Sequence, residues 1–273
     1  MNAQDRSTHS GDIPSWRQTA LWEKLKSKRS PEAEAVRSTF ERWLPKIQNI
    51  LTLGGTSPTD FTLHDAGHAF RVAQRMAQLV PQDILGHLSV YELALLLLSA
   101  YLHDIGMTPE QSKIVRHYQY LVTGNQTLLS SPEQHLFQLF LDDQFDGVTA
   151  PIAKNTPTES DLRRTSEIIT YYARFRHNDW SEEWIRSNLS EETLGTYEGW
   201  VNDLITICRS HHEGYSDLRQ ERFKPRLVGS PATVFQMRYL AVILRVADIL
   251  EFDPERTPLV LFKHRFISPS SLI

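Results

Sequence analysis

Apolar residues recur at helical spacing along most of the chain, and one run among them has almost no polar interruption. Between residues 31 and 53, apolar residues return at steps of three and four, which predicts an amphipathic helix. Residues 93–100 (LALLLLSA) form the longest apolar run, and such a run is normally buried. The run leads into His103-Asp104, and Gly106 follows. The pattern therefore places an imidazole and a carboxylate at the end of a core helix.

Other segments follow the same helical spacing. A capping pattern at Thr62–Asp65 (TLHD) predicts a helix that runs to about Leu79 and ends before Pro81. Residues 142–160 are rich in Asp, Gly, Pro, Asn and Thr, so we expect a mobile loop there, with a lid over a site as one role. Few strands are expected, and the fold class is all-α. Further helices are expected at residues 16–25, 111–122, 132–141, 161–175, from Ser181, from Ser190 to about Ser210, and at 231–252.

Length and composition bound the domain organisation. The chain has 273 residues, of which 40% are hydrophobic and 10% aromatic, enough for one substantial domain with or without an arm. We expect a disordered tail at residues 1–14 and an N-terminal helical extension at 15–54. The main domain is expected at 55–256. A C-terminal tail would follow at 257–273, where a further region could begin.

Charge and cysteine content exclude some classes of protein. The net charge of −4 gives no basic surface for wrapping long nucleic acid, although a short strand could enter a local groove. The single cysteine, Cys208, excludes an internal disulfide framework and fits a reducing compartment. Residues 1–17 lack the apolar core of a signal peptide, and the longest apolar run falls short of the roughly 20 residues of a spanning helix. We therefore expect a cytoplasmic protein with no membrane partner.

Histidines and aspartates stand at the ends or in the middle of several expected helices. His64 and His68 are four residues apart and would share one helix face. Each residue also has an ordinary structural explanation: a core histidine satisfied by hydrogen bonds, or a buried Asp248 paired with Arg245. Carboxylates in apolar helices are costly unless they are paired or bind metal, and imidazole with carboxylate suits Mn, Fe, Co, Ni or Zn. The candidate ligands are His64, His68, His103, Asp104, His177, His211, His212 and Asp248.

The ordered set of these residues resembles the HD-domain superfamily of metal-dependent phosphohydrolases. The matching segments are HAFRVA with His68, YLHDIG with His103 and Asp104, and RVADIL with Asp248. The resemblance covers roughly residues 55–255. It implies a multi-helix HD-domain bundle behind the N-terminal helical extension.

Two further segments are similar to the extra histidines of two-metal members of that superfamily. These are RFRHND with His177 and HHEG at residues 211–214, and the second distantly resembles the HD-GYP branch. That branch usually has a lysine where this chain has Met107, and its GYP element is replaced by Gly-Tyr-Ser at 214–216. Hydrolysis of cyclic di-GMP is therefore not expected.

The resemblance implies one or two divalent transition-metal ions, with Mg as a further possibility. Such ions lower the pKa of a shared water and neutralise charge on phosphoryl oxygens. Asp104 would serve catalysis by bridging the two ions. His211 is favoured over His212 as a ligand, although the sequence does not decide between them. The implied ligands are His68, His103, Asp104 and Asp248 for the first ion, and Asp104, His177 and His211 or His212 for the second.

Five further residues have expected roles beside the ligands. His64 would contact substrate or act as a general acid, and the alternative is a solvent-facing histidine at a helix start. Arg71 and Arg245 are candidates for phosphate contact, or else partners of core carboxylates. Asp65 is expected to cap its helix. Glu213 is expected to orient a ligand.

We therefore expect a metal-dependent phosphoric ester hydrolase that acts on a nucleotide or another phosphoester. One alternative is an HD-type nuclease for single-stranded nucleic acid, which Arg222, Lys224 and Arg226 would serve. Another is a non-catalytic nucleotide-sensing module that regulates a neighbouring domain, and a minority alternative is a di-iron oxygenase. A homo-oligomer or a fused regulatory partner domain is compatible with each of these, and some HD domains are fused to ATPase modules.

Overall fold

Helix α5 (Val90–Leu102) lies at the centre of the fold because its surface is apolar on all sides. Every residue from Tyr91 to Leu102 is buried. Ser89 begins the helix with a capping box, in which its side chain accepts from the Glu92 amide and Glu92 accepts from the Ser89 amide. The buried helix expected from the sequence is confirmed.

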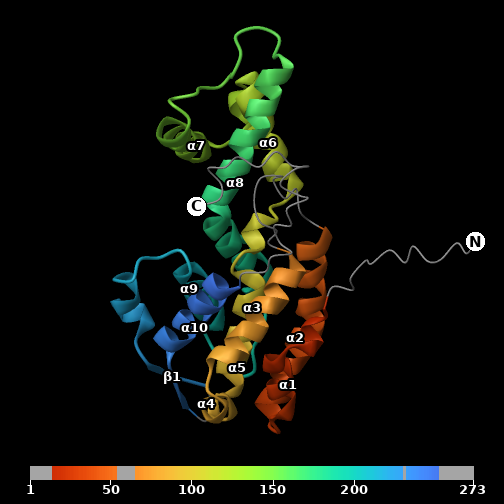
Figure 1. Cartoon of the computed structure of the whole chain (residues 1–273), viewed down its shortest axis with the longest axis vertical. Helices are drawn as coiled ribbons and strands as arrows, with labels where there is room; N and C mark the ends of the chain where they lie inside the picture. The colour runs from red at the N-terminus through yellow and green to blue at the C-terminus, as the bar shows by residue number, and fades with distance from the viewer. Residues whose placement is uncertain (1–13, 54–64, 230–231, 252–273) are drawn as a thin grey trace, which may run out of the picture.

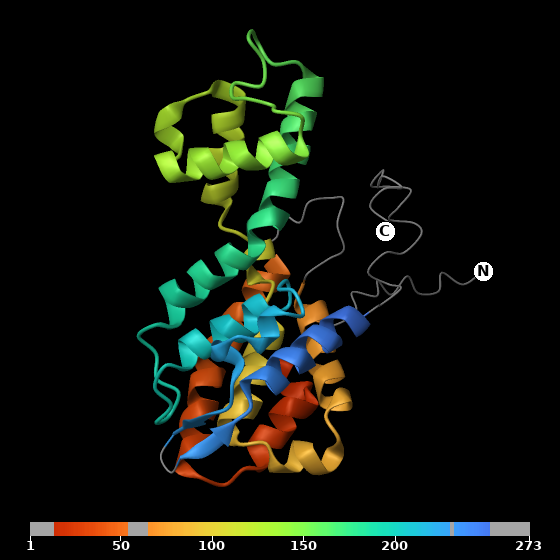
Figure 2. The ribbon, with the colours of Figure 1, turned by 90° about the vertical axis from the view of Figure 1, so that its left-hand side faces the viewer.

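The computed structural model describes residues 14–53, 65–229 and 232–251, and these are mainly helical (Figures 1 and 2). The all-α class is confirmed. The other α-helices are α1 (Ala20–Ser27), α2 (Pro31–Leu53), α3 (Ala66–Leu79), α4 (Gln82–His87), α6 (Gln111–Thr123), α7 (Ser131–Gln144), α8 (Glu159–Leu189), α9 (Trp200–Ser210) and α10 (Met237–Leu250). Short 3₁₀ turns include η2 (Ile105–Met107). Strands β1 (Arg226–Val228) and β2 (Thr233–Phe235) form a hairpin.

The main core surrounds α5. Helices α1, α2, α3, α9 and α10 all pack on α5, so the N-terminal helices share one core with the helices that carry the candidate ligands. Trp22 and Phe40 from the N-terminal helices stack on each other in that core. The apolar face expected for residues 31–53 is buried there, and α2 has the expected bounds.

A second cluster of aromatic and aliphatic side chains forms a separate lobe at one end of α8, with α6 and α7 (Figure 2). The loop at residues 145–158 packs on this lobe, and its Ile152 amide donates to the Leu121 carbonyl at 2.8 Å. The loop precedes Glu159, which at 1.5 Å per residue is about 27 Å along α8 from His177. The expectation of a lid over the site is therefore wrong.

Three helix boundaries differ from the sequence-based expectation. Helix α8 continues through Ser181, where a new helix was expected, because the Ser181 side chain is buried in tertiary contacts instead of capping. Helix α9 begins at Trp200 and not near Ser190, after Gly199 with a positive φ of 75°. The expected helix at 231–252 is replaced by the hairpin and α10.

Helix α3 begins later in the sequence than expected. Its first residue is Ala66, and the Asp65 side chain caps it by accepting from the His68 amide at 2.9 Å. The capping role expected for Asp65 is therefore confirmed. Thr62 and His64 lie outside the described residues.

The segment Val90–Thr123 has the length and apolar composition of a membrane-crossing helix, but 94% of its most apolar window is buried inside the protein. This burial is the pattern of a core helix, and it agrees with the central position of α5.

The η2 turn fits tightly against α8. A Cβ at Gly106 would lie 2.0 Å from the His177 carbonyl oxygen and 2.7 Å from the Ser181 amide nitrogen. Both neighbours are backbone atoms of a helix, so they cannot move aside cheaply. Only glycine allows the turn after Asp104 to approach α8 this closely.

Gly106→Ala should therefore lower the free energy of unfolding by about 1–3 kcal/mol or more, because the new methyl group overpacks a backbone contact. Calorimetric unfolding measures the change. Gly86→Ala is the matched control, since its Cβ would meet only the Lys24 amine at 3.8 Å in a helix where alanine is favoured. A Gly106→Ala protein as stable as the wild type would contradict this account of the turn.

Candidate metal centre

Candidate ligands from five helices and one turn meet at the C-terminal end of α5. The first and last of these candidate ligands, His68 and Asp248, are 180 residues apart in the sequence, so only the tertiary fold brings them together. His68 lies on α3, His103 at the end of α5, Asp104 at the start of the η2 turn, His177 on α8, His211 and His212 at the end of α9, and Asp248 on α10.

His68, His103, Asp104 and Asp248 form the first ligand group, in which one potential ligand atom from each residue lies within 4.8 Å of the others. The Nε2 atoms of His68 and His103 are 3.4 Å apart. An Asp248 oxygen lies 3.5 Å from His68 Nε2 and 3.7 Å from His103 Nε2. The donors therefore converge on one point.

His177, His211 and His212 form the second ligand group, again with ligand atoms within 4.8 Å. The Nε2 atoms of His177 and His211 are 3.3 Å apart. The His212 ring packs at 4.4 Å from the His177 ring and 4.5 Å from the His211 ring, measured between centroids. Burial, with the neighbouring His211 and His177, lowers the pKa of His212 to about 4, so its imidazole is neutral at physiological pH. Both His211 and His212 have positions suited to a ligand.

Asp104 lies between the two groups, with one carboxylate oxygen toward each. Its Oδ2 is 3.3 Å from His103 Nε2 and 3.7 Å from His68 Nε2. Its Oδ1 is 3.3 Å from His211 Nε2 and 3.5 Å from His177 Nε2. Because the side chain is almost fully buried, its charge is shared by these imidazoles with little screening by solvent.

Backbone carbonyls determine which ring nitrogen of each histidine carries the proton. Nδ1 of His103 lies 3.1 Å from the Ser99 carbonyl, and Nδ1 of His177 and His211 contact the carbonyls of residues three positions earlier. A carbonyl can only accept, so each of these Nδ1 atoms is the donor, and in the neutral ring that a metal binds Nε2 then carries the lone pair. In their neutral rings, the facing Nε2 atoms of His177 and His211 are two acceptors, an arrangement that a cation between them would stabilise.

The spacing of these atoms fits a transition metal. Two nitrogens that each lie about 2.0–2.1 Å from a shared ion at a tetrahedral angle are about 3.4 Å apart. The two pairs of Nε2 atoms are 3.4 and 3.3 Å apart. Imidazole and carboxylate donors suit Mn, Fe, Co, Ni or Zn.

The electrostatics of the first ligand group also favour a cation. Burial would lower the pKa of His103, but the carboxylates of Asp104 and Asp248 raise it well above its ordinary value. Burial would raise the pKa of Asp248, but its contact with His103 lowers it to about 2. Without an ion, a proton on His103 balances these buried carboxylates, and a bound cation would take the place of that proton.

Comparison with known families gives one match: the model of the HD-CE family matches residues 59–273. The chain belongs to the HD-CE family. No curated protein and no solved structure matches the chain. The matched region of this HD-CE chain includes all the candidate ligands from His68 to Asp248, and the expected HD-type domain is confirmed.

The other residues singled out from the HD-CE sequence have different positions. Arg71 donates from Nε to a Glu251 oxygen, and Arg245 donates to the Ser210 carbonyl at 2.9 Å, so each has a structural contact beside the ligands. Glu213 forms an ion pair with Arg222 at 2.9 Å, and the orienting role expected for it has no matching contact among the described hydrogen bonds.

Sequence reasoning missed two residues that support the HD-CE centre. The buried Glu251 carboxylate accepts from His68 Nδ1 at 2.8 Å. The Ser181 hydroxyl accepts from the Gly106 amide and donates to the His103 carbonyl, each at 2.9 Å. The spacing of Glu251, three residues after Asp248 at the end of one helix, was the only sequence signal available.

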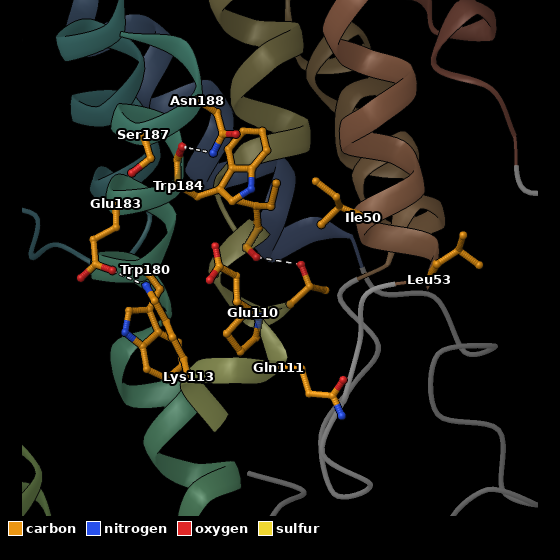
Figure 3. A pocket seen from close by; sticks show the side chains of 14 residues that line it. Ile50, Leu53, Glu110, Gln111, Lys113, Trp180, Glu183, Trp184, Ser187 and Asn188 are labelled. Atoms are coloured by element: carbon orange, nitrogen blue, oxygen red, sulfur yellow. Dashed lines mark hydrogen bonds and ion pairs between the residues drawn. The ribbon is translucent and has the colours of Figure 1, made fainter. Parts of the chain in front are cut away.

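A cavity of about 770 Å³ is lined in part by Ile105 and Gly106 of the η2 turn (Figure 3). Trp180, Trp184 and Lys113 line one wall, and Ile50 and Leu53 of α2 lie across from them (Figure 3). None of the candidate ligands lines this cavity, so it is a feature separate from the two ligand groups.

Mn²⁺ should stabilise this HD-CE protein, because an ion that binds only the folded state shifts the unfolding equilibrium. At a hundredfold excess over Kd the gain is about 2.7 kcal/mol, or a rise in Tm of roughly 5–10 °C. Thermal unfolding of chelator-treated protein with and without Mn²⁺ measures it. Asp104→Asn should abolish most of the rise, and an equal rise in that variant would exclude the two ligand groups as the site.

Proposed function

We propose that this protein is a metal-dependent phosphoric ester hydrolase with two divalent ions bridged by Asp104. The observation that carries the proposal is the position of the Asp104 carboxylate, whose two oxygens face separate histidine groups. A bridging carboxylate is the usual way to hold two ions at the short separation that phosphoryl transfer requires. Membership of an HD-type family supports the same chemistry.

The protein side chains would prepare the centre for hydrolysis. Ions bound there would lower the pKa of a water and neutralise charge on the phosphoryl oxygens. The chain itself orients the Nε2 atoms of His103, His177 and His211 through the carbonyl contacts at Nδ1. The proposed ligands are His68, His103, Asp104 and Asp248 for one ion, and Asp104, His177 and His211 for the other, with His212 beside them.

Arginines near the two ligand groups support an anionic substrate. Arg245 and Arg71 lie next to the ligands, and their structural contacts fix their positions there. Arg174 is exposed on α8, one turn before His177, and its charge contributes to the low pKa of His212. We propose that a nucleotide or another phosphoester binds on this side of the centre, with arginine contacts to phosphate.

The contacts of the basic loop bear on the nuclease alternative. Arg222 pairs with Glu213, Lys224 with Glu221, and Arg226 with Asp203. These ion pairs offset the positive charge expected to serve a nucleic-acid strand, so a small phosphoester is the favoured substrate over single-stranded DNA.

Hydrolysis should appear in a screen of nucleotides, bis-p-nitrophenyl phosphate and single-stranded DNA with Mn²⁺ or Co²⁺. Asp104→Ala should reduce kcat/KM at least 100-fold, because it removes the carboxylate shared by both ligand groups. Phosphate or nitrophenol release measures the rate, and circular dichroism checks that the variant is folded.

Glu92→Gln is the control, since Glu92 is buried on α5 but belongs to a helix cap. Hydrolysis that survives in Asp104→Ala would contradict the proposal. Nucleotide binding without product from a metal-loaded protein would favour the sensing module. Oxygen uptake by an iron-loaded protein that hydrolyses none of these substrates would favour the oxygenase.

A further inference from the structure

The four histidines with contacts through both ring nitrogens differ in what holds their Nδ1 atoms. His103, His177 and His211 contact backbone carbonyls through Nδ1. His68 instead contacts the Glu251 carboxylate, at 2.8 Å. A carboxylate is a stronger acceptor than a neutral carbonyl, so it increases the basicity of the ring more. His68 is thus distinguished within the first ligand group.

Glu251 is itself fixed from the opposite side. Its side chain is 2% exposed, and its second oxygen accepts from the Arg71 guanidinium. Arg71 and His68 stand three residues apart on one face of α3. The Glu251 carboxylate, just after the end of α10, therefore contacts both side chains. A buried carboxylate without such partners would cost several kcal/mol, whereas here both of its oxygens are satisfied.

We propose that Glu251, anchored by Arg71, is a positioning residue that holds His68 with its Nε2 lone pair toward the metal. This inference rests on the proposed metal centre. Glu251 needs no contact with the ion or the substrate for this role. It fixes the Nδ1 proton and the ring orientation of His68, and it adds negative charge behind the ligand. The Arg71 guanidinium, earlier a candidate for phosphate contact, acts in this arrangement by orienting Glu251.

The test is Mn²⁺ binding by calorimetry to chelator-treated wild-type, Glu251→Gln and Glu251→Ala proteins. Loss of such an outer carboxylate typically weakens metal affinity by about 10–100-fold. Glu251→Ala should show a loss of this size, and Glu251→Gln a smaller one, because its amide oxygen can still accept from Nδ1 while the charge is gone. Arg71→Gln should weaken affinity in the same direction.

The matched control is Asp203→Asn. Asp203 is also a buried carboxylate held by an arginine, Arg226, but its other partner is the Tyr197 hydroxyl and not a histidine. This variant should lose stability and keep the wild-type Mn²⁺ affinity. If Asp203→Asn weakened Mn²⁺ binding as much as Glu251→Ala, the effect would be general destabilisation and the inference would be overturned.

A second measurement reports the histidine ring directly and needs no metal. Long-range ¹H–¹⁵N spectra of the metal-free protein should show His68 protonated at Nδ1 in the wild type and a mixture of tautomers in Glu251→Ala. Unchanged His68 signals together with wild-type Mn²⁺ affinity in Glu251→Ala would overturn the inference. If Asp104→Ala lost Mn²⁺ binding in the same assay, only the inference about Glu251 would fail and the proposed metal centre would stand; if it did not, the proposed centre would fail as well.

Discussion

The close contact between the η2 turn and α8 is the constraint on which the centre depends. The turn carries Asp104 on one side of Gly106, and α8 carries His177 against its backbone. Ser181 joins the two by bonding the Gly106 amide and the His103 carbonyl. The two ligand groups therefore keep a fixed separation, because the backbones of the η2 turn and α8 are in direct contact and the buried Ser181 hydroxyl bridges them.

The same arrangement explains how a protein interior accepts so many polar groups. Three buried or half-buried carboxylates, Asp104, Asp248 and Glu251, surround histidines whose outer nitrogens are all satisfied. Each acidic group faces at least one imidazole or guanidinium. Arg71 balances Glu251, so the charge of Asp104 and Asp248 is the part whose burial a cation between the Nε2 atoms would offset.

The sequence was sufficient to pick out candidate ligands that the fold brings together, and insufficient for the residues that support them. His68, His103, Asp104 and Asp248 could be found because polar residues in apolar helices are conspicuous and few chemistries explain them. Glu251 and Ser181 could not, since a glutamate at a helix end and a serine in a helix are ordinary until tertiary contacts are known. The hairpin at 226–235 was missed for a related reason: three-residue strands have too short a pattern to outweigh the helical spacing that follows. The uninterrupted course of α8 also depended on where the Ser181 hydroxyl bonds, which no local pattern records.

The contact between His68 and Glu251 joins residues 183 positions apart, and Asp248 completes the first ligand group from α10, the helix that Glu251 directly follows. A chain still emerging from the ribosome therefore has most of its histidines available before it has the residues that complete the first ligand group. The growing chain can offer only a partial, weaker set of donors until α10 has been made and has docked on α3. Binding of a metal by the complete first ligand group would therefore depend on the docking of α10 on α3.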